Sequence, residues 1–185
     1  MGRGVAREVV DAVESGWIRR GARSIDIGCG EGELSAYLAE HGLIATGIDI
    51  SEAAIARANR MFGQTAGVSF VVHDICASPP AGGPFDVVVD RGCLHQIAEV
   101  DRPLYRRHLL DITRGGARLI LFVRAFRDGV PLGDPAERDS LTTTYTSALG
   151  PPFALVRSEL TYLDTRNGAD PETALGGLVF WFERN

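Results

Sequence analysis

The sequence predicts an α/β fold, in which a seven-stranded, mainly parallel sheet carries helices on both faces and an antiparallel hairpin at its C-terminal edge. Short apolar runs alternate with segments of helical period through most of the chain. Two strand-like segments then follow each other at the C-terminal end with no helical pattern between them. Alternation favours a parallel sheet, and consecutive strands favour an antiparallel pair. With 185 residues, 45% of them hydrophobic, the chain is expected to form one domain, 1–185.

The individual elements follow from apolar spacing and from turn residues. Continuous apolar runs such as 85–89 suit strands that are buried on both faces. Ser51 is expected to cap a helix, Gly115-Gly116 to close another, and 125–138 to be irregular. The strands are expected at 24–27, 43–48, 68–72, 85–89, 117–123, 153–163 and 177–182. Helices are expected in 3–15 and around 139–148. Three more are expected between them: one with Leu34 and Leu38 on its apolar face that ends at His41-Gly42, one that follows Ser51 and buries Ile55 and Phe62, and one that Asp101 and Pro103 open.

Composition limits the compartment and the partners. The formal net charge is -5 and no basic run occurs, so non-specific nucleic-acid binding is not expected, although a local basic pocket stays possible. No apolar stretch reaches the roughly 18 residues of a membrane helix. Cys29, Cys76 and Cys93 show neither CxxC nor zinc-ligand spacing, so we expect reduced thiols in a cytoplasm, no membrane partner and no metal.

A glycine loop lies between the first expected strand and the helix after it. It reads Asp26-Ile-Gly28-Cys-Gly30-Glu-Gly32, a G-x-G-x-G spacing that differs from the G-x-G-x-x-G of dinucleotide binders. Glycine permits positive φ and leaves room for a ligand. The N–H groups that begin the next helix favour an anionic group.

Two aspartates follow the next two expected strands. Asp49 ends the second strand, where a carboxylate can accept hydrogen bonds from ribose hydroxyls, and Asp74 ends the third. Each has an alternative explanation, because Asp is also a favoured turn residue. Their joint occurrence with the glycine loop favours a nucleoside site.

Together these segments resemble class I S-adenosylmethionine-dependent methyltransferases, whose fold is Rossmann-like. The matching pieces cover 23–123 and include Ser24–Gly32, Thr46–Ser51, Val72–Ile75, Phe85–Asp90 and Gly115–Ile120. The resemblance implies an N-terminal helix or lid in 1–22, a cofactor-binding core in 23–123, and a substrate loop with the C-terminal hairpin in 124–185.

The resemblance also implies which residues bind S-adenosylmethionine and its product S-adenosylhomocysteine. Gly28, Cys29, Gly30 and Gly32 would line the methionine end, with Asp26 near the amino group. Asp49 would bind the ribose and Ile50 would pack on the adenine. Asp74 and Ile75 would hold the far side of the adenine, and Asp90 would lie where the fourth strand meets the methyl-transfer pocket.

The implied reaction is methyl transfer to a small-molecule oxygen, nitrogen, sulfur or halide acceptor. Good alignment removes about 7–11 kcal/mol of barrier and a general base about 3–5 kcal/mol, so positioning dominates. The candidate catalytic residues are Asp90, Arg91 and His95. Arg91 alternatively pairs with a carboxylate, His95 alternatively opens a helix, and Cys93 is favoured as a packed thiol.

The segment after the fourth strand limits the classes of acceptor that are expected. It reads Asp90-Arg-Gly-Cys93, not the [DN]-P-P-[FYW] of amide and exocyclic-amine methyltransferases, and no Pro-Cys nucleophile or catechol-type acid cluster is found. The run Phe85–Gly92 is similar to that of thiopurine, thiol and halide methyltransferases and their tellurite-resistance relatives, although their longer N-terminal extension is missing. Candidate acceptor contacts are Trp17, Arg91, His95, Arg124, Arg127 and Tyr145.

Three rival functions stay open at this point. A dinucleotide-dependent oxidoreductase would want G-x-G-x-x-G and, usually, a Tyr-x-x-x-Lys pair, whereas this chain contains no lysine. A non-catalytic S-adenosylmethionine sensor would carry the same cofactor motifs. An aminopropyl transferase would need more acids around the fourth strand. The oligomeric state is left undetermined.

Overall fold

Seven strands form one sheet in the order β3-β2-β1-β4-β5-β7-β6. The computed structural model describes residues 5–124, 134–162 and 176–185. The first five strands are parallel, and β7 runs antiparallel between β5 and β6, which confirms the predicted fold class. The strands are β1 (Arg23–Ile27), β2 (Ile44–Asp49), β3 (Val68–Val72), β4 (Phe85–Arg91), β5 (Thr113–Arg124), β6 (Phe153–Tyr162) and β7 (Gly176–Arg184).

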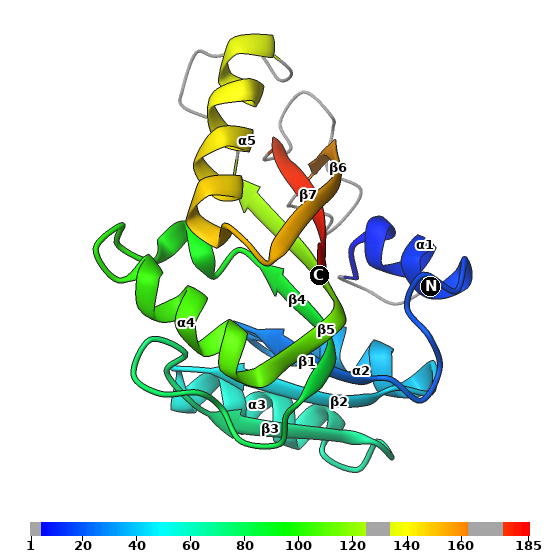
Figure 1. Cartoon of the computed structure of the whole chain (residues 1–185). Coiled ribbons are helices and arrows are strands. Elements are labelled where there is room, and N and C mark those ends of the chain that lie inside the picture. Colours follow the sequence, from blue (N-terminus) through cyan, green and yellow to red (C-terminus); the bar gives the residue numbers. More distant parts are fainter. Residues whose placement is uncertain (1–4, 125–133, 163–175) are drawn as a thin grey trace.

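Helices cover both faces of this sheet. Figure 1 shows α1 and α4 on opposite sides of it. Ser51 caps α3 as predicted, because its hydroxyl accepts the N–H of Ala54 at 3.2 Å. No helix among the described residues is long and apolar enough to cross a membrane. The helices are α1 (Arg7–Glu14), α2 (Glu33–Glu40), α3 (Glu52–Phe62), the short 3-10 helix η1 (Leu94–Gln96), α4 (Arg102–Ile112) and α5 (Pro135–Leu149).

The core consists of two main layers, one on each face of the sheet. On one face, Val9 of α1 and Leu38 of α2 pack with Trp181 of β7. On the other, Leu109 of α4 and Leu149 of α5 pack with strand residues that include Val88 and Phe180. Burial of these side chains supplies the main stabilisation of the fold.

Two expected boundaries are wrong. Helix α5 begins at Pro135, not at 139, because the Asp134 carboxylate caps it by accepting the N–H of Glu137 at 2.9 Å. Gly115-Gly116 does not separate helix from strand, since β5 begins directly after α4, at Thr113. The register between β4 and β5 shifts after the pair Phe85–Thr113, and this irregularity accommodates the glycines.

The strand order reverses between β1 and β4. From β1 the chain proceeds outward through β2 to β3, and it then returns to place β4 on the other side of β1. The two neighbouring connections leave in opposite directions, which opens a crevice at the carboxyl ends of these strands. The link from β3 to β4, residues 73–84, contains no helix. A ligand site is therefore expected at the carboxyl ends of these strands.

Candidate functional site

A pocket of about 310 Å³ lies at the carboxyl ends of β1, β2 and β4. Gly28 and Asp49 form one side of it, and Arg91 at the end of β4 contributes to the other. Of the predicted cofactor residues, those that line the pocket are Gly28, Asp49, Ile50, Asp74 and Ile75. These five predicted residues therefore come together from the ends of three strands, β1, β2 and β3, as expected of ligand sites in open α/β sheets.

The glycine loop requires glycine for two reasons, a positive φ at all three positions and a lack of room for a side chain at two of them. Gly28, Gly30 and Gly32 have φ values of 73°, 55° and 86°, which side chains rarely adopt. A Cβ on Gly28 would lie 3.0 Å from the Cβ of Cys93, and one on Gly32 would lie 2.5 Å from the Phe70 ring. A Cβ on Gly30 would meet nothing within 4 Å. Gly28 and Gly32 are thus set by packing, whereas Gly30 faces open space.

Asp49 holds this loop in place through both carboxylate oxygens. Its Oδ2 accepts the Gly30 N–H at 2.9 Å, and its Oδ1 accepts the Ser51 N–H at 2.8 Å. Each ionised oxygen has two acceptor positions, so each retains one for a ligand hydroxyl. The turn-shaping and ligand-binding interpretations of Asp49 are therefore compatible.

The far side of the pocket combines an exposed acid with apolar side chains. The Asp74 carboxylate accepts the N–H of Cys76 at 2.8 Å and is itself exposed. Ile75 is buried, and its carbonyl contacts Nδ1 of His108 at 2.6 Å. The Ile50 side chain is 72% exposed although it lines a pocket. An uncovered isoleucine at a pocket wall is a surface on which a flat aromatic ring can pack.

Asp26 lies buried beneath the glycine loop. Its Oδ2 accepts a hydrogen bond from the Ser35 hydroxyl at 2.7 Å. Burial raises the pKa of Asp26 to about 7, and the charge of Asp90 adds to the rise, whereas Ser35 and Arg91 oppose it. Asp26 is therefore close to half ionised near neutral pH, a state that a nearby cation would shift toward the carboxylate.

The Asp90 carboxylate accepts hydrogen bonds from the turn that follows it. It accepts the N–H groups of Gly92, Cys93 and Leu94, at 3.1, 2.7 and 3.0 Å, and the Tyr105 hydroxyl at 2.8 Å. The side chain is fully buried. Burial raises its pKa to about 6 against these hydrogen bonds. Asp90 thus shapes the turn after β4 and does not line the pocket, and its contact with cofactor or acceptor stays a prediction.

This network gives a stability prediction. Asp90→Ala is expected to lower the free energy of unfolding by about 3 kcal/mol or more, because several buried donors lose their acceptor. Tyr105→Phe removes one donor and is expected to cost about 1 kcal/mol. Urea unfolding at pH 8 measures both values. If Asp90→Ala unfolds at the wild-type urea concentration, the structural role of Asp90 is wrong.

Arg91 and His95 occupy different places. Arg91 lines the pocket, as expected of an acceptor contact. His95 lies in η1 with its ring against Gly92, and its buried Nδ1 has no hydrogen-bond partner among the described residues. Burial lowers the pKa of His95, so the imidazole is neutral near pH 7. His95 does not belong to the pocket wall, so the geometry favours Arg91 over His95 for contact with an acceptor.

Several predicted acceptor contacts lie elsewhere. Trp17 lies at the amino ends of the strands, so it cannot reach the pocket. Its ring packs edge-on against Trp181, with the two ring centroids 4.9 Å apart. Tyr145 is a core residue of α5 that packs against Phe180. Arg124 is exposed at the end of β5. Arg127 lies outside the described residues.

Cys29 also departs from its predicted role. Its N–H donates to the carbonyl of Ile48, but its thiol packs toward Gly47 and the small α3 cluster, away from the pocket wall. Burial raises the pKa of the Cys29 and Cys93 thiols above their ordinary range, which leaves them protonated.

Part of the pocket wall comes from residues that the sequence did not single out. His73, Cys76, Gln96 and Ile97 also line it. Gln96 donates its side-chain amide to the Gly92 carbonyl at 2.8 Å. No spacing signal identifies these residues, because they come from the two connections that follow β3 and β4. The described residues contain no group of ligating side chains able to hold a metal ion.

The residues present fit S-adenosylmethionine. Unused acceptor positions on Asp49 match the ribose hydroxyls, and the exposed Ile50 matches the adenine ring. A Cβ at position 30 would occupy open space beside the pocket. Asp26 lies buried next to the glycine loop and does not itself line the pocket. The pocket therefore provides the polar and apolar contacts that an adenosyl compound requires.

Comparisons with known proteins agree with this geometry. A family model described as a methyltransferase domain matches residues 25–116. An uncharacterized methyltransferase of Schizosaccharomyces pombe is 34% identical over 105 residues, which are 56% of this chain and 71% of that protein. The 2-heptyl-1-hydroxyquinolin-4(1H)-one methyltransferase of Mycobacteroides abscessus is 27% identical over 148 residues, which cover 75% of this chain and 64% of that protein.

A solved structure supports the same fold. The magnesium protoporphyrin IX methyltransferase of Synechocystis, with bound S-adenosylhomocysteine, superimposes with a TM-score of 0.71 at 22% identity, covering 96% of this chain and 80% of that one. Fold, glycine loop and relatives agree, and the chain belongs to the class I S-adenosylmethionine-dependent methyltransferases.

Proposed function

We propose that this methyltransferase modifies a small-molecule acceptor, and that it works mainly by positioning. The pocket of about 310 Å³ supports the proposal, because it is lined by loops and is of the size that small ligands occupy. A relative that covers three quarters of this chain is named for a hydroxyquinolinone acceptor. The free thiols of Cys29, Cys76 and Cys93 support a reducing compartment such as the cytoplasm.

The cofactor contacts are proposed from the pocket geometry. Bound S-adenosylmethionine supplies a methyl group on a positively charged sulfur. Asp49 accepts hydrogen bonds from the ribose hydroxyls, Ile50 packs on the adenine, and Asp74 accepts from the adenine amino group. The Gly30 backbone leaves room for the methionine part, and Asp26 attracts its ammonium group.

The acceptor is proposed to approach from the side of Arg91. Arg91 lies at the end of β4 on the pocket wall, where a guanidinium can orient an anionic or polar acceptor. Alignment of the acceptor atom with the methyl carbon contributes most of the rate, so a strong general base is unnecessary. His95 and Asp90 are not assigned a chemical step, because neither lines the pocket.

The test is an acceptor screen with methyl-labelled S-adenosylmethionine. We expect label to transfer to at least one member of a panel of thiols, phenols, amines and halides. Asp49→Ala is expected to abolish this transfer and to weaken S-adenosylhomocysteine binding about 10- to 100-fold, because charge-assisted hydrogen bonds to the ribose are lost. Calorimetry measures the binding.

Asp111→Ala is the matched control, since it removes an exposed acid of α4 far from the pocket. Unchanged binding by Asp49→Ala would contradict the ribose assignment. Label found in protein or nucleic acid, and in no small acceptor, would contradict the proposed substrate class. Tight cofactor binding with no labelled acceptor at all would favour a sensor over an enzyme.

A further inference from the structure

A second pocket, of about 430 Å³, lies at the amino ends of the strands, opposite the cofactor pocket. It is lined by Ala22 just before β1, by Asp86 near the start of β4, and by Arg118 of β5. Asp86 and Arg91 stand at opposite ends of β4, about 16 Å apart at the usual rise per residue. This amino-end pocket is therefore separate from the cofactor pocket.

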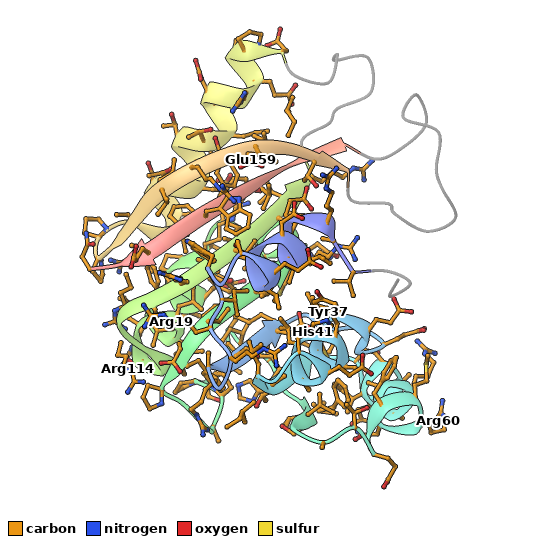
Figure 2. The ribbon with its side chains drawn as sticks, turned by 90° about the vertical axis from the view of Figure 1, so that its right-hand side faces the viewer. Arg19, Tyr37, His41, Arg60, Arg114 and Glu159 are labelled. Atoms are coloured by element: carbon orange, nitrogen blue, oxygen red, sulfur yellow. The ribbon has the colours of Figure 1, made fainter. Side chains whose placement is uncertain are left out.

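Arginines dominate the charge of the amino-end pocket. Its wall contains Arg19, Arg20 and Arg118 against two acids, Asp86 and Glu183. Asp86 is already paired, because its carboxylate accepts from the Arg114 guanidinium at 2.7 Å. Figure 2 shows Arg19 and Arg114 on the same side of the molecule. The region is thus locally basic on a chain whose formal net charge is -5.

Arg118 is held in place by a tryptophan. Its guanidinium lies over the Trp17 ring, 4.8 Å from the ring centroid, and donates to the Trp17 carbonyl. Trp17 in turn packs edge-on against Trp181 of β7. An arginine fixed in this way loses little side-chain entropy when it binds an oxyanion.

The other two arginines have guanidinium groups that are unpaired within the described part of the chain. Arg19 and Arg20 are exposed, and neither guanidinium makes an ion pair or a hydrogen bond with the described residues. The Arg20 methylene groups lie close to Gly42, with Cγ 3.7 Å from a Cβ built there. Gly21 and Gly116 leave open space on the same wall. The pocket thus offers room beside one fixed and two available guanidinium groups.

We infer that the amino-end pocket is a binding site for an anionic small molecule, held through a phosphate or carboxylate group by Arg19, Arg20 and Arg118. Guanidinium groups bind both kinds of oxyanion with paired, charge-assisted hydrogen bonds. The site is independent of methyl transfer, because it lies on the other edge of the sheet.

The experiment uses tryptophan fluorescence. The chain has two tryptophans; Trp17 lines this pocket and contacts Trp181, so the emission is sensitive to a ligand bound there. Pyrophosphate, inorganic phosphate and succinate are titrated separately at constant ionic strength. We expect a saturable change with at least one of them. Stronger binding of the phosphates assigns a phosphoryl group, and stronger binding of succinate assigns a carboxylate.

The double variant Arg19→Gln, Arg20→Gln is expected to weaken this binding at least tenfold. The matched control is Arg60→Gln, Arg107→Gln, which removes two exposed arginines of α3 and α4 and changes the net charge equally. Figure 2 shows Arg60 far from Arg19. Calorimetry with S-adenosylhomocysteine checks that both variants are folded.

Two outcomes would overturn the inference. One is a fluorescence response that shows no saturation with any of the three anions. The other is equal weakening by the two double variants, which would mean that only the overall charge matters. Neither outcome affects the proposed methyl transfer, whose readouts are cofactor binding and label transfer.

Discussion

Asp26→Asn is expected to make the cofactor-free protein more stable at pH 8 and, at the same time, to weaken cofactor binding. Asp26 is buried, and its pKa is raised to about 7 from an unfolded value of 3.8. The folded state therefore binds its proton more tightly than the unfolded state, and stability falls as pH rises from about 4 to 7. Asparagine keeps the shape and carries no charge.

The size of the stability effect follows from the pKa difference. Ionised Asp26 costs up to about 4 kcal/mol above pH 7. This cost falls to about 1 kcal/mol near pH 4.5 and disappears below about pH 3, where the carboxyl is protonated in both states. We therefore expect Asp26→Asn to unfold at higher urea concentration than wild type at pH 8, and most of this difference to be lost near pH 4.5. Equal stability of the two proteins at pH 8 would contradict the raised pKa.

The binding effect has the opposite sign. If the Asp26 carboxylate attracts the ammonium group of the cofactor, binding must release a proton whenever Asp26 starts protonated. Wild-type affinity is then expected to rise about a hundredfold from pH 5 to pH 8 and to level off above pH 7. Asp26→Asn is expected to bind weakly at all pH values without this slope. Calorimetry in two buffers of different ionisation enthalpy measures the proton release.

The fold was predictable because its signals are local and repeated. Apolar runs, the glycine loop and the cap at Ser51 occur in a consistent order, so the mainly parallel sheet and its edge hairpin follow from general rules. The missed start of α5 was also locally encoded. Asp134-Pro-Ala-Glu137 has the form of a helix N-terminus, but the surrounding glycines and prolines favoured a loop.

The site was predictable where it depends on strand ends. Asp49 and Asp74 follow parallel neighbouring strands, so topology alone brings them to one edge. Trp17 was predicted to contact the acceptor, but it precedes β1. It therefore lies at the amino ends of the strands, opposite the cofactor pocket. For Asp90, the sequence does not show which groups its carboxylate already binds. Its position at the end of β4 was predicted. The hydrogen bonds that its carboxylate accepts from backbone N–H groups and from Tyr105 are seen only in the folded structure.

The remaining prediction separates binding from folding within the glycine loop. Gly32→Ala is expected to destabilise the protein by about 3 kcal/mol or more, because a left-handed residue with a side chain costs about 1–2 kcal/mol and overpacking adds a similar amount. Its Cβ would lie 2.5 Å from the Phe70 ring and 2.9 Å from the Ala58 Cβ. The fraction of the variant that is folded is expected to bind the cofactor with wild-type affinity.

Gly30→Ala differs, although it stands two residues away and also has positive φ. Its Cβ meets no protein atom within 4 Å, so it is expected to cost only the about 1–2 kcal/mol of backbone strain. The same methyl group would occupy the space proposed for the methionine part of the cofactor, and affinity is expected to fall at least tenfold. Urea unfolding and calorimetry on both variants distinguish the two effects. If Gly30→Ala binds S-adenosylhomocysteine with wild-type affinity, the cofactor does not pass over Gly30, and the proposed orientation of its methionine end is wrong.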